Sequence, residues 1–351
     1  MTPVGVIGLG IESSCDETSV ALIRNGSECL ANLVHSQIEQ HAPFRGVVPE
    51  IASRAHLEKI NTLYDRALVE AGLSTEQLEY VSVSVRPGLV GSLMVGAQFA
   101  KSFALVTGRP IIGVDHLEAH LYAPCLEGHR PEFPFLGLLL SGGNSAIFMV
   151  HGPGQLELLA DTLDDACGEA FDKAAAILGL PFPGGPHVER AAAGFHPEAS
   201  HRRLFPKLLR HRGDAPPAFS FSGIKTALLR AVQDGSHPVE LLAWDFQDTV
   251  FELVERVLLR LVQTTGITRV VASGGVLANQ TLRVRLEKLA RESGFALVYP
   301  RSRLLCTDNA AMIGALGYFL RNTAFQFRDL SFDVSSKRYL PPARPSDSLR
   351  P

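Results

Sequence analysis

The sequence predicts an α/β fold made of two similar lobes, each built around a mixed sheet. Three observations support this prediction. The chain has 351 residues, a length typical of about two domains. A pattern of strand, Gly/Ser turn, strand, turn and strand occurs twice. Helices alternate with strands after each copy, as they do in α/β proteins.

The first copy of the pattern opens the chain. Residues 4–12 are apolar and interrupted by glycines, and residues 19–24 form a second short apolar run. Asn25-Gly26 joins this run to residues 28–34 and is the dipeptide typical of a type I′ hairpin turn. We therefore expect three strands that form a meander.

The second copy lies in the middle of the chain. Apolar strands are expected at 135–140, 145–151 and 156–160, and turns rich in glycine separate them at 141–144 and 152–154. Two copies of one pattern indicate an internal duplication, with one copy in each lobe.

Further helices and strands follow each copy. After the first copy we expect a capping-box turn at 74–77, a strand at 80–85, a helix at 91–107, a strand at 110–114 and a helix that starts near Asp115. After the second copy we expect helices at 162–178 and 239–264, a strand at 269–272 and a helix from about residue 279. Acidic residues in the first turn of the helix at 162–178 suit its dipole.

These elements predict the domain boundaries. The first lobe covers 1–133 and carries a pair of histidines, and a C-terminal helix at about 309–330 completes it. The second lobe covers 134–308 and is expected to bind a nucleotide. The segment 337–351 is rich in proline and is expected to be a flexible tail.

Composition excludes several classes of protein. The 33 basic and 36 acidic side chains give a net charge of −3, so the chain is no polycation and any contact with nucleic acid must come from a local patch. The five cysteines are scattered without a CxxC pair, which argues against a disulfide framework or a zinc ribbon and favours a reducing compartment. No basic signal region opens the chain, and no apolar run approaches a membrane span. We expect a cytoplasmic protein with no membrane contact.

The strongest chemical motif is a pair of histidines. His116 and His120 are four residues apart, so on a helix their side chains share one face and can bind one metal ion. Glu118 lies about 200° around the helix from His116, so it points away from that face, unlike the glutamate of a zinc-protease box. Asp308 is the best candidate for a third ligand. The alternative is two ordinary helix histidines, with Asp115 and Asp308 as helix N-caps.

Three Gly/Ser turns follow apolar strands, at 10–14, 141–144 and 273–275. Backbone N–H groups in such turns can hold a phosphate. None of the three matches the P-loop or the Rossmann fingerprint. The alternative is that each is only a tight connection. A fourth turn at 183–186 contains two glycines that allow a ligand to approach closely.

Several charged residues are further candidates. Asp165, Glu169 and Asp172 share a face of the expected helix at 162–178, where Asp172 could accept hydrogen bonds from ribose hydroxyls; the alternative is a solvated acidic face. Asp16 and Glu17 follow the first glycine turn and could orient a reacting group or only shape the turn. The densest basic run, 201–212, could contact RNA phosphates or be a solvated helix face. Its charged and aromatic members are Arg202, Arg203, Phe205, Lys207, Arg210 and Arg212.

Taken together, these motifs resemble one family, the bacterial tRNA N6-adenosine threonylcarbamoyltransferases, once described as O-sialoglycoprotein endopeptidases. The resemblance covers about residues 4–320. The motifs, in chain order, are GIESSCDET (10–18), GVVPEIASRAH (46–56), PGLVGSL (87–93), HLEAH (116–120), GEAFDK (168–173), PGGP (183–186), FSFSGIKT (219–226) and SGGVLAN (273–279).

The resemblance implies an actin/Hsp70/sugar-kinase-like fold with two ribonuclease H-like lobes. It implies one divalent metal, Fe²⁺ or alternatively Zn²⁺, held by His116, His120 and Asp308. The donor would be threonylcarbamoyl-AMP, and the acceptor N6 of the adenosine beside the anticodon in tRNAs that read codons beginning with A. The implied ligand cleft consists of Leu139, Leu140, Ser141, Gly142, Gly143, Asp172, Gly185, Glu189 and Asn279.

The resemblance also implies partners. Bacterial members work with tRNA, a smaller paralogue of the same fold and a small P-loop ATPase, while a separate enzyme makes the adenylate. Our hypothesis for the mechanism is that the metal acts as a Lewis acid on the donor. Asp16 or Glu17 would assist the proton that leaves N6, and these two are the catalytic candidates.

One position departs from the family pattern. The usual SGGH-T turn is here Ser141-Gly142-Gly143-Asn144-Ser145, and Asn144 can hydrogen-bond a phosphate but carries no charge. Three rival functions are a metalloprotease, which rests on the histidine pair alone, a small-molecule kinase of the same fold, and a non-catalytic nucleotide-binding partner in a tRNA-modifying complex.

Overall fold

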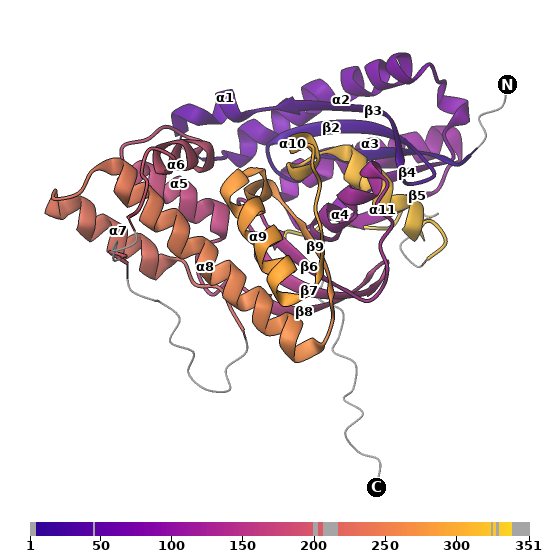
Figure 1. Cartoon of the computed structure of the whole chain (residues 1–351). Coiled ribbons are helices and arrows are strands. Elements are labelled where there is room, and N and C mark those ends of the chain that lie inside the picture. Colours follow the sequence, from indigo (N-terminus) through magenta and orange to yellow (C-terminus); the bar gives the residue numbers. More distant parts are fainter. Residues whose placement is uncertain are drawn as a thin grey trace, which may run out of the picture.

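Two mixed β-sheets with packed helices make up the protein in a computed structural model (Figure 1). The structure describes residues 5–44, 46–198, 203–205, 217–323, 326–327 and 330–338. The sheet near the N-terminus, with helices α2 and α3, occupies the upper part of Figure 1. The second sheet lies below it together with α8 and α9.

The first sheet has six strands in the order β11-β5-β4-β1-β2-β3. The meander β1–β3 is antiparallel, and β4 and β5 add to it in parallel. The strands are β1 (Ile7–Glu12), β2 (Glu17–Arg24), β3 (Glu28–Ser36), β4 (Tyr80–Arg86), β5 (Ile111–Asp115) and β11 (Gln326–Phe327). Asn25 and Gly26 have φ values of 53° and 70°, so the type I′ turn predicted there is confirmed.

The second sheet repeats this arrangement with five strands in the order β10-β9-β6-β7-β8. Again an antiparallel meander is extended by two parallel strands. The strands are β6 (Phe135–Leu140), β7 (Ser145–Gly152), β8 (Gln155–Asp161), β9 (Arg269–Ser273) and β10 (Ala296–Val298). The duplication and the mixed α/β fold predicted from the sequence are confirmed.

Helices cover the sheets. They are α1 (Ile38–His41), α2 (Pro49–Ala71), α3 (Val90–Thr107), α4 (His116–Tyr122), α5 (Cys167–Ile177), α6 (Gly184–Ala192), α7 (Ser222–Asp234), α8 (Val239–Thr265), α9 (Gln280–Ser293), α10 (Arg303–Cys306) and α11 (Ala310–Leu320). Short 3₁₀ turns include Thr75–Gln77, where Ser74 and Gln77 form the predicted capping box, and Gly275–Ala278.

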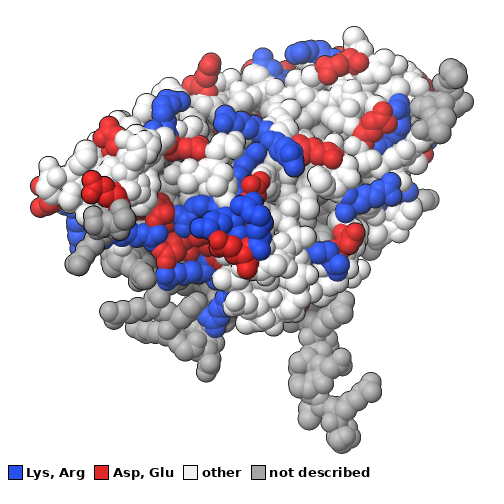
Figure 2. Space-filling view, viewed as in Figure 1, with Lys and Arg blue, Asp and Glu red and all other residues white. Residues whose placement is uncertain are grey.

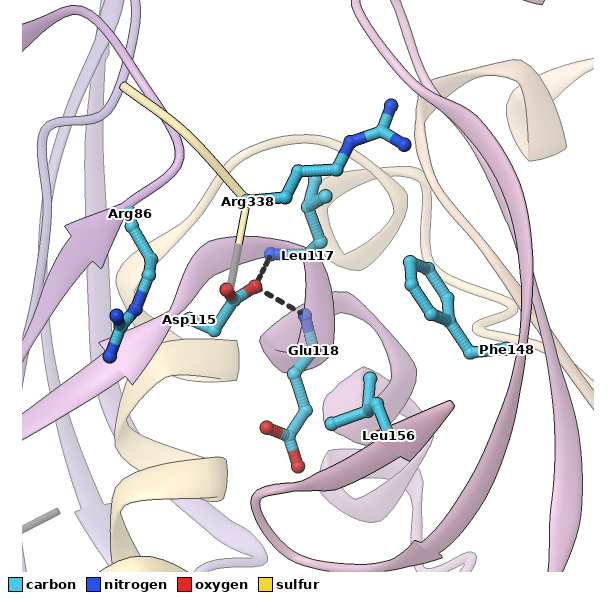
Figure 3. A pocket seen from close by; sticks show the side chains of 7 residues that line it. All are labelled: Arg86, Asp115, Leu117, Glu118, Phe148, Leu156 and Arg338. Atoms are coloured by element: carbon cyan, nitrogen blue, oxygen red, sulfur yellow. Dashed lines mark hydrogen bonds between the residues drawn. The ribbon is translucent and has the colours of Figure 1, made fainter. Parts of the chain in front are cut away.

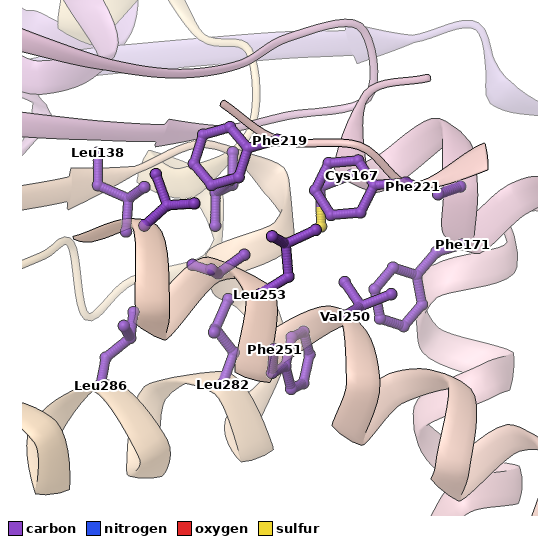
Figure 4. Packing of buried hydrophobic residues seen from close by; sticks show 14 of the residues in the cluster. Leu138, Cys167, Phe171, Phe219, Phe221, Val250, Phe251, Leu253, Leu282 and Leu286 are labelled. Atoms are coloured by element: carbon purple, nitrogen blue, oxygen red, sulfur yellow. The ribbon is translucent and has the colours of Figure 1, made fainter. Parts of the chain in front are cut away.

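The largest core lies between the second sheet and helices α5, α7, α8 and α9. Figure 4 shows aromatic rings meeting there, with Phe171 beside Phe251 and Phe219 above the leucines of α8 and α9. The centroids of Phe171 and Phe251 are 5.7 Å apart, and those of Phe219 and Phe221 are 6.0 Å apart. Aromatic pairs at this separation add to the stabilisation from burial.

Helix α11 packs unusually close to β1 because both contain glycine. A Cβ on Gly10 of β1 would collide with the carbonyl oxygen of Ala310, and a Cβ on Gly314 would collide with Ile23 of the neighbouring strand β2. This close packing fixes the start of α11, and with it Asp308, near the end of β1.

Helix α3 is long and apolar enough to cross a membrane, with a mean hydropathy of 1.3, which corrects the expectation that no segment approaches that limit. α3 packs against β4 and α2, and 39% of it is buried. A helix that covers one face of a sheet in a globular core has the same composition.

The predicted helix at 162–178 begins late, at Cys167. Residues 161–165 are held by other bonds instead: Leu163 N–H donates to the carbonyl of Phe219, and the Asp164 carboxylate accepts from the N–H groups of Phe221 and Ser222. The prediction that Asp165 shares a helix face with Glu169 and Asp172 is therefore wrong. Of the expected tail 337–351, residues 339–351 lie outside the described residues.

Candidate functional site

The paired histidines lie where the sequence places them, on α4 directly after β5. The Asp115 carboxylate caps this helix by accepting from the N–H groups of Leu117 (2.9 Å) and Glu118 (3.2 Å). The rings of His116 and His120 have centroids 4.8 Å apart. Both side chains are buried, so two imidazoles face one point from one short helix.

Asp308 joins them from a position 188 residues further along the chain than His120. Its Oδ1 is 3.2 Å from His120 Nε2 and 3.6 Å from His116 Nε2, and all three ligand atoms lie within 4.8 Å of one another. Ligands about 2.0–2.2 Å from one ion are separated by about 3–4 Å, so one ion can reach all three. Asn309, not Asp308, caps α11 by accepting from Met312 N–H. The alternative of Asp308 as an N-cap is wrong.

Glu12 also belongs to this site, although the sequence analysis does not single it out. Its Oε2 is 2.8 Å from Nδ1 of His116, and its Oε1 accepts from Ser14 N–H (2.5 Å) and Ser84 Oγ–H (3.2 Å). The carboxylate of Glu12 accepts from Nδ1–H, so Nε2, which faces Asp308, is the nitrogen that a metal could use. The available signal was an acidic residue that ends a fully buried apolar strand.

The charges of the site are strongly coupled. Burial alone lowers the pKa of His116, but the carboxylates of Glu12 and Asp308 outweigh it and raise that pKa to about 10. Burial lowers the pKa of His120 against the opposing effect of Asp308. Burial alone raises the pKa of Asp308, but the two imidazoles outweigh it and lower that pKa to about 2. The site therefore favours a positive charge at its centre.

These residues fit a divalent metal ion. Two imidazoles and one carboxylate form the donor set of many iron(II) sites and also suit zinc. Nδ1 of His120 is buried and has no hydrogen-bond partner among the described residues, so the contact of this ring with Asp308 is made through Nε2. The Asp308 side chain is 24% exposed, which leaves one side of the site open to a substrate.

Glu118 points away from this site, as its position in the helix predicts. Its Oε1 accepts from the N–H of Gly154 at 2.7 Å, in the turn between β7 and β8. It lines a small cavity with Arg86, Asp115 and Leu156, and Figure 3 shows its side chain extending beside Leu156. Burial raises its pKa to about 8. Because it faces the second sheet, Glu118 cannot serve as the base of a zinc protease.

Glu17 is the first residue of β2, and Asp16 directly precedes it. Burial, and then the carboxylates of Asp308 and Asp16, raise the pKa of Glu17 to about 9. Glu17 accepts a hydrogen bond from Ser36 Oγ–H at 3.3 Å. This carboxyl group can hold a proton at neutral pH.

The glycine turns of the second lobe meet one another. Ser141 N–H donates to the carbonyl of Asn144, which closes the first turn. Gly168 and Glu169, at the start of α5, donate N–H groups to the carbonyls of Ser141 and Gly142. The turn after β9 touches the same region, because a Cβ on Gly274 would collide with the backbone of Leu140.

Four glycines of these turns border open space. A Cβ built on any of them meets no described atom within 4 Å; the four are Gly142, Gly143, Gly185 and Gly275. A ligand could therefore approach their backbones closely. Leu139 and Leu140 have fully buried side chains, so only their backbones could face a ligand.

The polar candidates of the cleft are already bonded to backbone. Asp172 accepts from Gly184 N–H (2.6 Å), and Glu189 accepts from Gln280 N–H (2.7 Å). Asn279 caps α9 through Leu282 N–H (3.0 Å) and donates to Gln247 (2.9 Å). Burial raises the pKa of Asp172. Each carboxylate uses one oxygen in these bonds, and the other oxygen can accept from a ligand.

Asp165 has a different environment from the other acids near α5. Its two oxygens pair with Lys173 at 2.5 Å and with Lys225 at 2.7 Å. Burial acts upward on its pKa, but the two ammonium groups lower it. Lys225 belongs to the FSFSGIKT motif, so this carboxylate joins that motif to α5.

Most of the basic run lies outside the described residues, including Arg202, Lys207, Arg210 and Arg212. Arg203 pairs with Asp248 and Glu252 of α8, and Phe205 is buried in the large core. Arg285 pairs with Asp248 and Glu255 in the same network. Figure 2 shows basic and acidic side chains interleaved on the face formed by α8 and α9. Arg203 is thus bound to carboxylates in this structure.

The cluster of His116, His120 and Asp308 is structurally linked to the glycine turns. α10, which precedes Asp308, packs against the 3₁₀ turn Gly275–Ala278. Arg283 of α9 donates to the carbonyls of Leu277, Pro300 and Arg301 and so holds the chain that leads to α10. Helix α10 and Arg283 therefore connect the two halves of the candidate site.

Comparison with known proteins gives consistent results. The family model described as "TsaD: tRNA N6-adenosine threonylcarbamoyltransferase" matches residues 28–315. A protein of that name from Leptospira interrogans is 49% identical over 95% of this chain and 98% of its own length. Proteins of the same name from Syntrophomonas wolfei (89% of this chain, 91% of the relative) and Geotalea uraniireducens (97% of each) are 44% identical.

Solved structures with low identity share the fold. HypF in its phosphate- and nucleotide-bound form has a TM-score of 0.61 at 15% identity, over 92% of this chain and 56% of that chain. Component A of Acidaminococcus fermentans (R)-2-hydroxyglutaryl-CoA dehydratase has a TM-score of 0.54 at 14% identity, over 90% and 98%. These neighbours agree with the actin/Hsp70/sugar-kinase-like fold. Because the family model matches most of the chain and the relatives align with it over nearly their whole length, this chain belongs to the tRNA N6-adenosine threonylcarbamoyltransferase family of enzymes.

Proposed function

We propose that this enzyme transfers the threonylcarbamoyl group from threonylcarbamoyl-AMP to N6 of adenosine 37 in tRNAs that read ANN codons, and releases AMP. The observation that carries this proposal is the convergence of His116, His120 and Asp308 beside glycine turns that border open space. Family membership supports the reaction class.

The reaction needs positioning more than activation, because the donor is already a mixed anhydride. N6 attacks the carbamoyl carbon, a C–N bond forms, the bond from that carbon to the phosphate oxygen breaks, and N6 loses a proton. A bound divalent metal would supply Lewis-acid polarisation of a carbonyl oxygen. The chain's own task is to hold the adenylate and the acceptor in line.

The residues divide between donor binding and proton transfer. We assign the adenylate to Leu139, Leu140, Ser141, Gly142, Gly143, Asp172, Gly185, Glu189 and Asn279. Backbone N–H groups of the glycine turns would bind the phosphate, and free oxygens of Asp172 and Glu189 would accept from hydroxyls. Asp16 or Glu17 would take the proton from N6, a role that requires the deprotonated carboxylate.

We propose iron(II) as the metal, with zinc as the alternative, because two histidines and one carboxylate with an open side form the usual donor set of non-haem iron. We also retain the proposed lobes, 1–133 completed by 309–330, and 134–308. The packing of α11 on β1 supports the first of these.

The proposed partners are tRNA, a smaller paralogue of the same fold and a small P-loop ATPase, and the proposed compartment is the cytoplasm. A groove of about 940 Å³ between α2 and α3 supports a protein partner. Its exposed apolar side chains include Leu57, Met94 and Val106, and a paralogue would offer matching helices of its own first lobe.

The decisive experiment combines metal analysis with a tRNA assay. Anaerobically purified protein is incubated with tRNA, threonine, bicarbonate, ATP and the partner proteins, and the nucleosides are analysed. We expect modified adenosine from the wild type, and loss of metal and at least 100-fold lower activity from His116→Ala and Asp308→Ala. His151→Ala, an exposed histidine on β7, is the matched control. If His116→Ala lost its metal but kept full activity, the Lewis-acid role would be wrong.

A further inference from the structure

The C-terminal segment 330–338 runs from the first lobe to the second. Leu330, Phe332 and Val334 pack into the core of the first lobe. Lys101 Nζ donates to the carbonyl of Phe332 at 2.9 Å, and Ser335 N–H donates to the carbonyl of Val85 at 2.9 Å, at the end of β4. These contacts attach the segment firmly to the first sheet.

The segment reaches the second lobe through Arg338. Its Nε and Nη2 donate to Oδ1 of Asn144 at 3.0 and 2.7 Å, and its Nη1 pairs with Asp161 at 2.6 Å. The side chain is 21% exposed. Figure 3 shows Arg338 on the opposite side of Asp115 from Arg86, above the start of α4.

Asn144 closes the glycine turn at the candidate adenylate site. Its N–H donates to Ser141 Oγ at 3.1 Å, and its carbonyl accepts from Ser141 N–H at 2.8 Å. These bonds use the backbone of Asn144 and leave its side chain available to Arg338, while the two glycines of the turn border open space. Arg338 holds this side chain with two hydrogen bonds that converge on one oxygen.

The chemistry of this contact suits a positioning role. A neutral asparagine brings no charge to the turn, whereas a guanidinium is always charged and presents its donors in a planar, rigid arrangement. Asp161 holds the guanidinium and offsets part of its charge. The turn is thereby fixed from the first lobe, which also carries the two histidines.

We propose that Arg338 is a positioning residue for the adenylate. It holds the turn 141–144 in the shape that receives a phosphate, and it couples that turn to the lobe that carries the metal ligands. This inference rests on the proposed function, which assigns the adenylate to the same turn.

The test measures AMP binding by calorimetry, and kcat and KM for threonylcarbamoyl-AMP, with the full chain and its partners. We expect Arg338→Ala to weaken AMP binding and raise KM about tenfold, with a smaller change in kcat and an unchanged metal content. Arg338→Lys should bind AMP as weakly as Arg338→Ala, because one ammonium group cannot reproduce the two hydrogen bonds that the guanidinium donates to Asn144. Lys337→Ala, at the exposed neighbouring position, should behave as the wild type.

A double-mutant cycle isolates the contact itself. Asn144→Ala should reproduce the loss of AMP binding, and adding Arg338→Ala to it should cause little further loss. If Arg338→Ala does not fold at the assay temperature, Arg338→Gln, which keeps most of the stem, is measured with the same expectation.

The outcomes separate the two proposals. One outcome is that Arg338→Ala, or its substitute Arg338→Gln, binds AMP as well as the wild type does. The inference about Arg338 is then overturned while the proposed function stands. If the losses in the cycle simply add, the contact with Asn144 is not the cause, and the inference is again overturned. If the wild type binds no AMP, the assignment of the turn fails, and both proposals fall.

Discussion

Glu12 and Glu118 are both buried acids near the paired histidines, and their surroundings give them different roles. Glu12 ends β1 and is held by Ser14, Ser84 and His116. Glu118 lies on the opposite face of α4 and binds a backbone N–H of the second lobe. One acid therefore holds the ring of His116, while the other joins α4 to the turn between β7 and β8.

Replacing Glu12 should weaken metal binding. Glu12→Gln keeps the size of the side chain but removes the charge that supports the His116 ring, so we expect metal affinity to fall about 10–100-fold. Competition with a chelator measures this affinity. Glu28→Gln, an exposed acid on β3, is the control. Equal affinities for Glu12→Gln and the wild type would contradict the orienting role.

Replacing Glu118 should change how stability depends on pH. The pKa of Glu118 is raised in the folded protein from 4.5 to about 8, so the folded state keeps a proton that the unfolded chain loses. The free energy of unfolding therefore falls as pH rises from about 4.5 to about 8. Gln also offers an oxygen to Gly154 but does not titrate.

We expect Glu118→Gln to gain roughly 2–4 kcal/mol relative to the wild type between pH 5 and pH 8. Urea unfolding at several pH values measures the difference. Glu157→Gln, an exposed acid on β8, should show no such trend. A constant difference across this range would mean that the pKa of Glu118 is close to its ordinary value.

At the scale of elements, two connections decide the geometry of the site. The turn after β9 packs on the backbone of Leu140, and α11 packs on β1. Each contact depends on a glycine that leaves room for another backbone. Contacts between elements also decide where α5 begins. Residues 161–165 form hydrogen bonds with the segment before α7, so they do not join the helix.

Gly274→Ala tests the first connection. Gly274 has φ of 101°, which a side chain adopts only under strain, and a Cβ there would collide with the Leu140 carbonyl. We expect a loss of about 2–4 kcal/mol in unfolding free energy together with weaker AMP binding. Gly46→Ala, where a Cβ meets no described atom within 4 Å, should change stability by less than about 1 kcal/mol. Wild-type stability for Gly274→Ala would contradict the packing described here.

At the scale of the whole molecule, α4 with its two histidines contacts strands of both sheets, and the groove between α2 and α3 lies on helices that pack against the first sheet. Leu57 and Val106 are 66% and 85% exposed in this groove. Large apolar side chains that share a groove usually mark a surface for another protein.

A charge in this groove should prevent partner binding. We expect Met94→Asp to weaken association with the smaller paralogue at least tenfold, because an unpaired carboxylate would be buried in the interface. Analytical ultracentrifugation measures the association. Val284→Asp, at an exposed apolar position on α9, is the control. Unchanged association for Met94→Asp would place the partner on another surface.

The sequence by itself determined the local features. Alternating apolar runs and glycine turns predict both meanders, and the spacing of His116 and His120 predicts a shared helix face. These properties depend only on neighbouring residues, because the periods of strands and helices are set by the backbone.

Only the tertiary structure decided which distant groups meet. Asp308 reaches the histidines because α11 packs on β1, Glu12 reaches His116 because β1 and β5 end at one edge of the sheet, and Arg338 reaches Asn144 across 194 residues. Such contacts depend on how sheets and helices pack against one another, and packing of this kind leaves no periodic signal in the sequence.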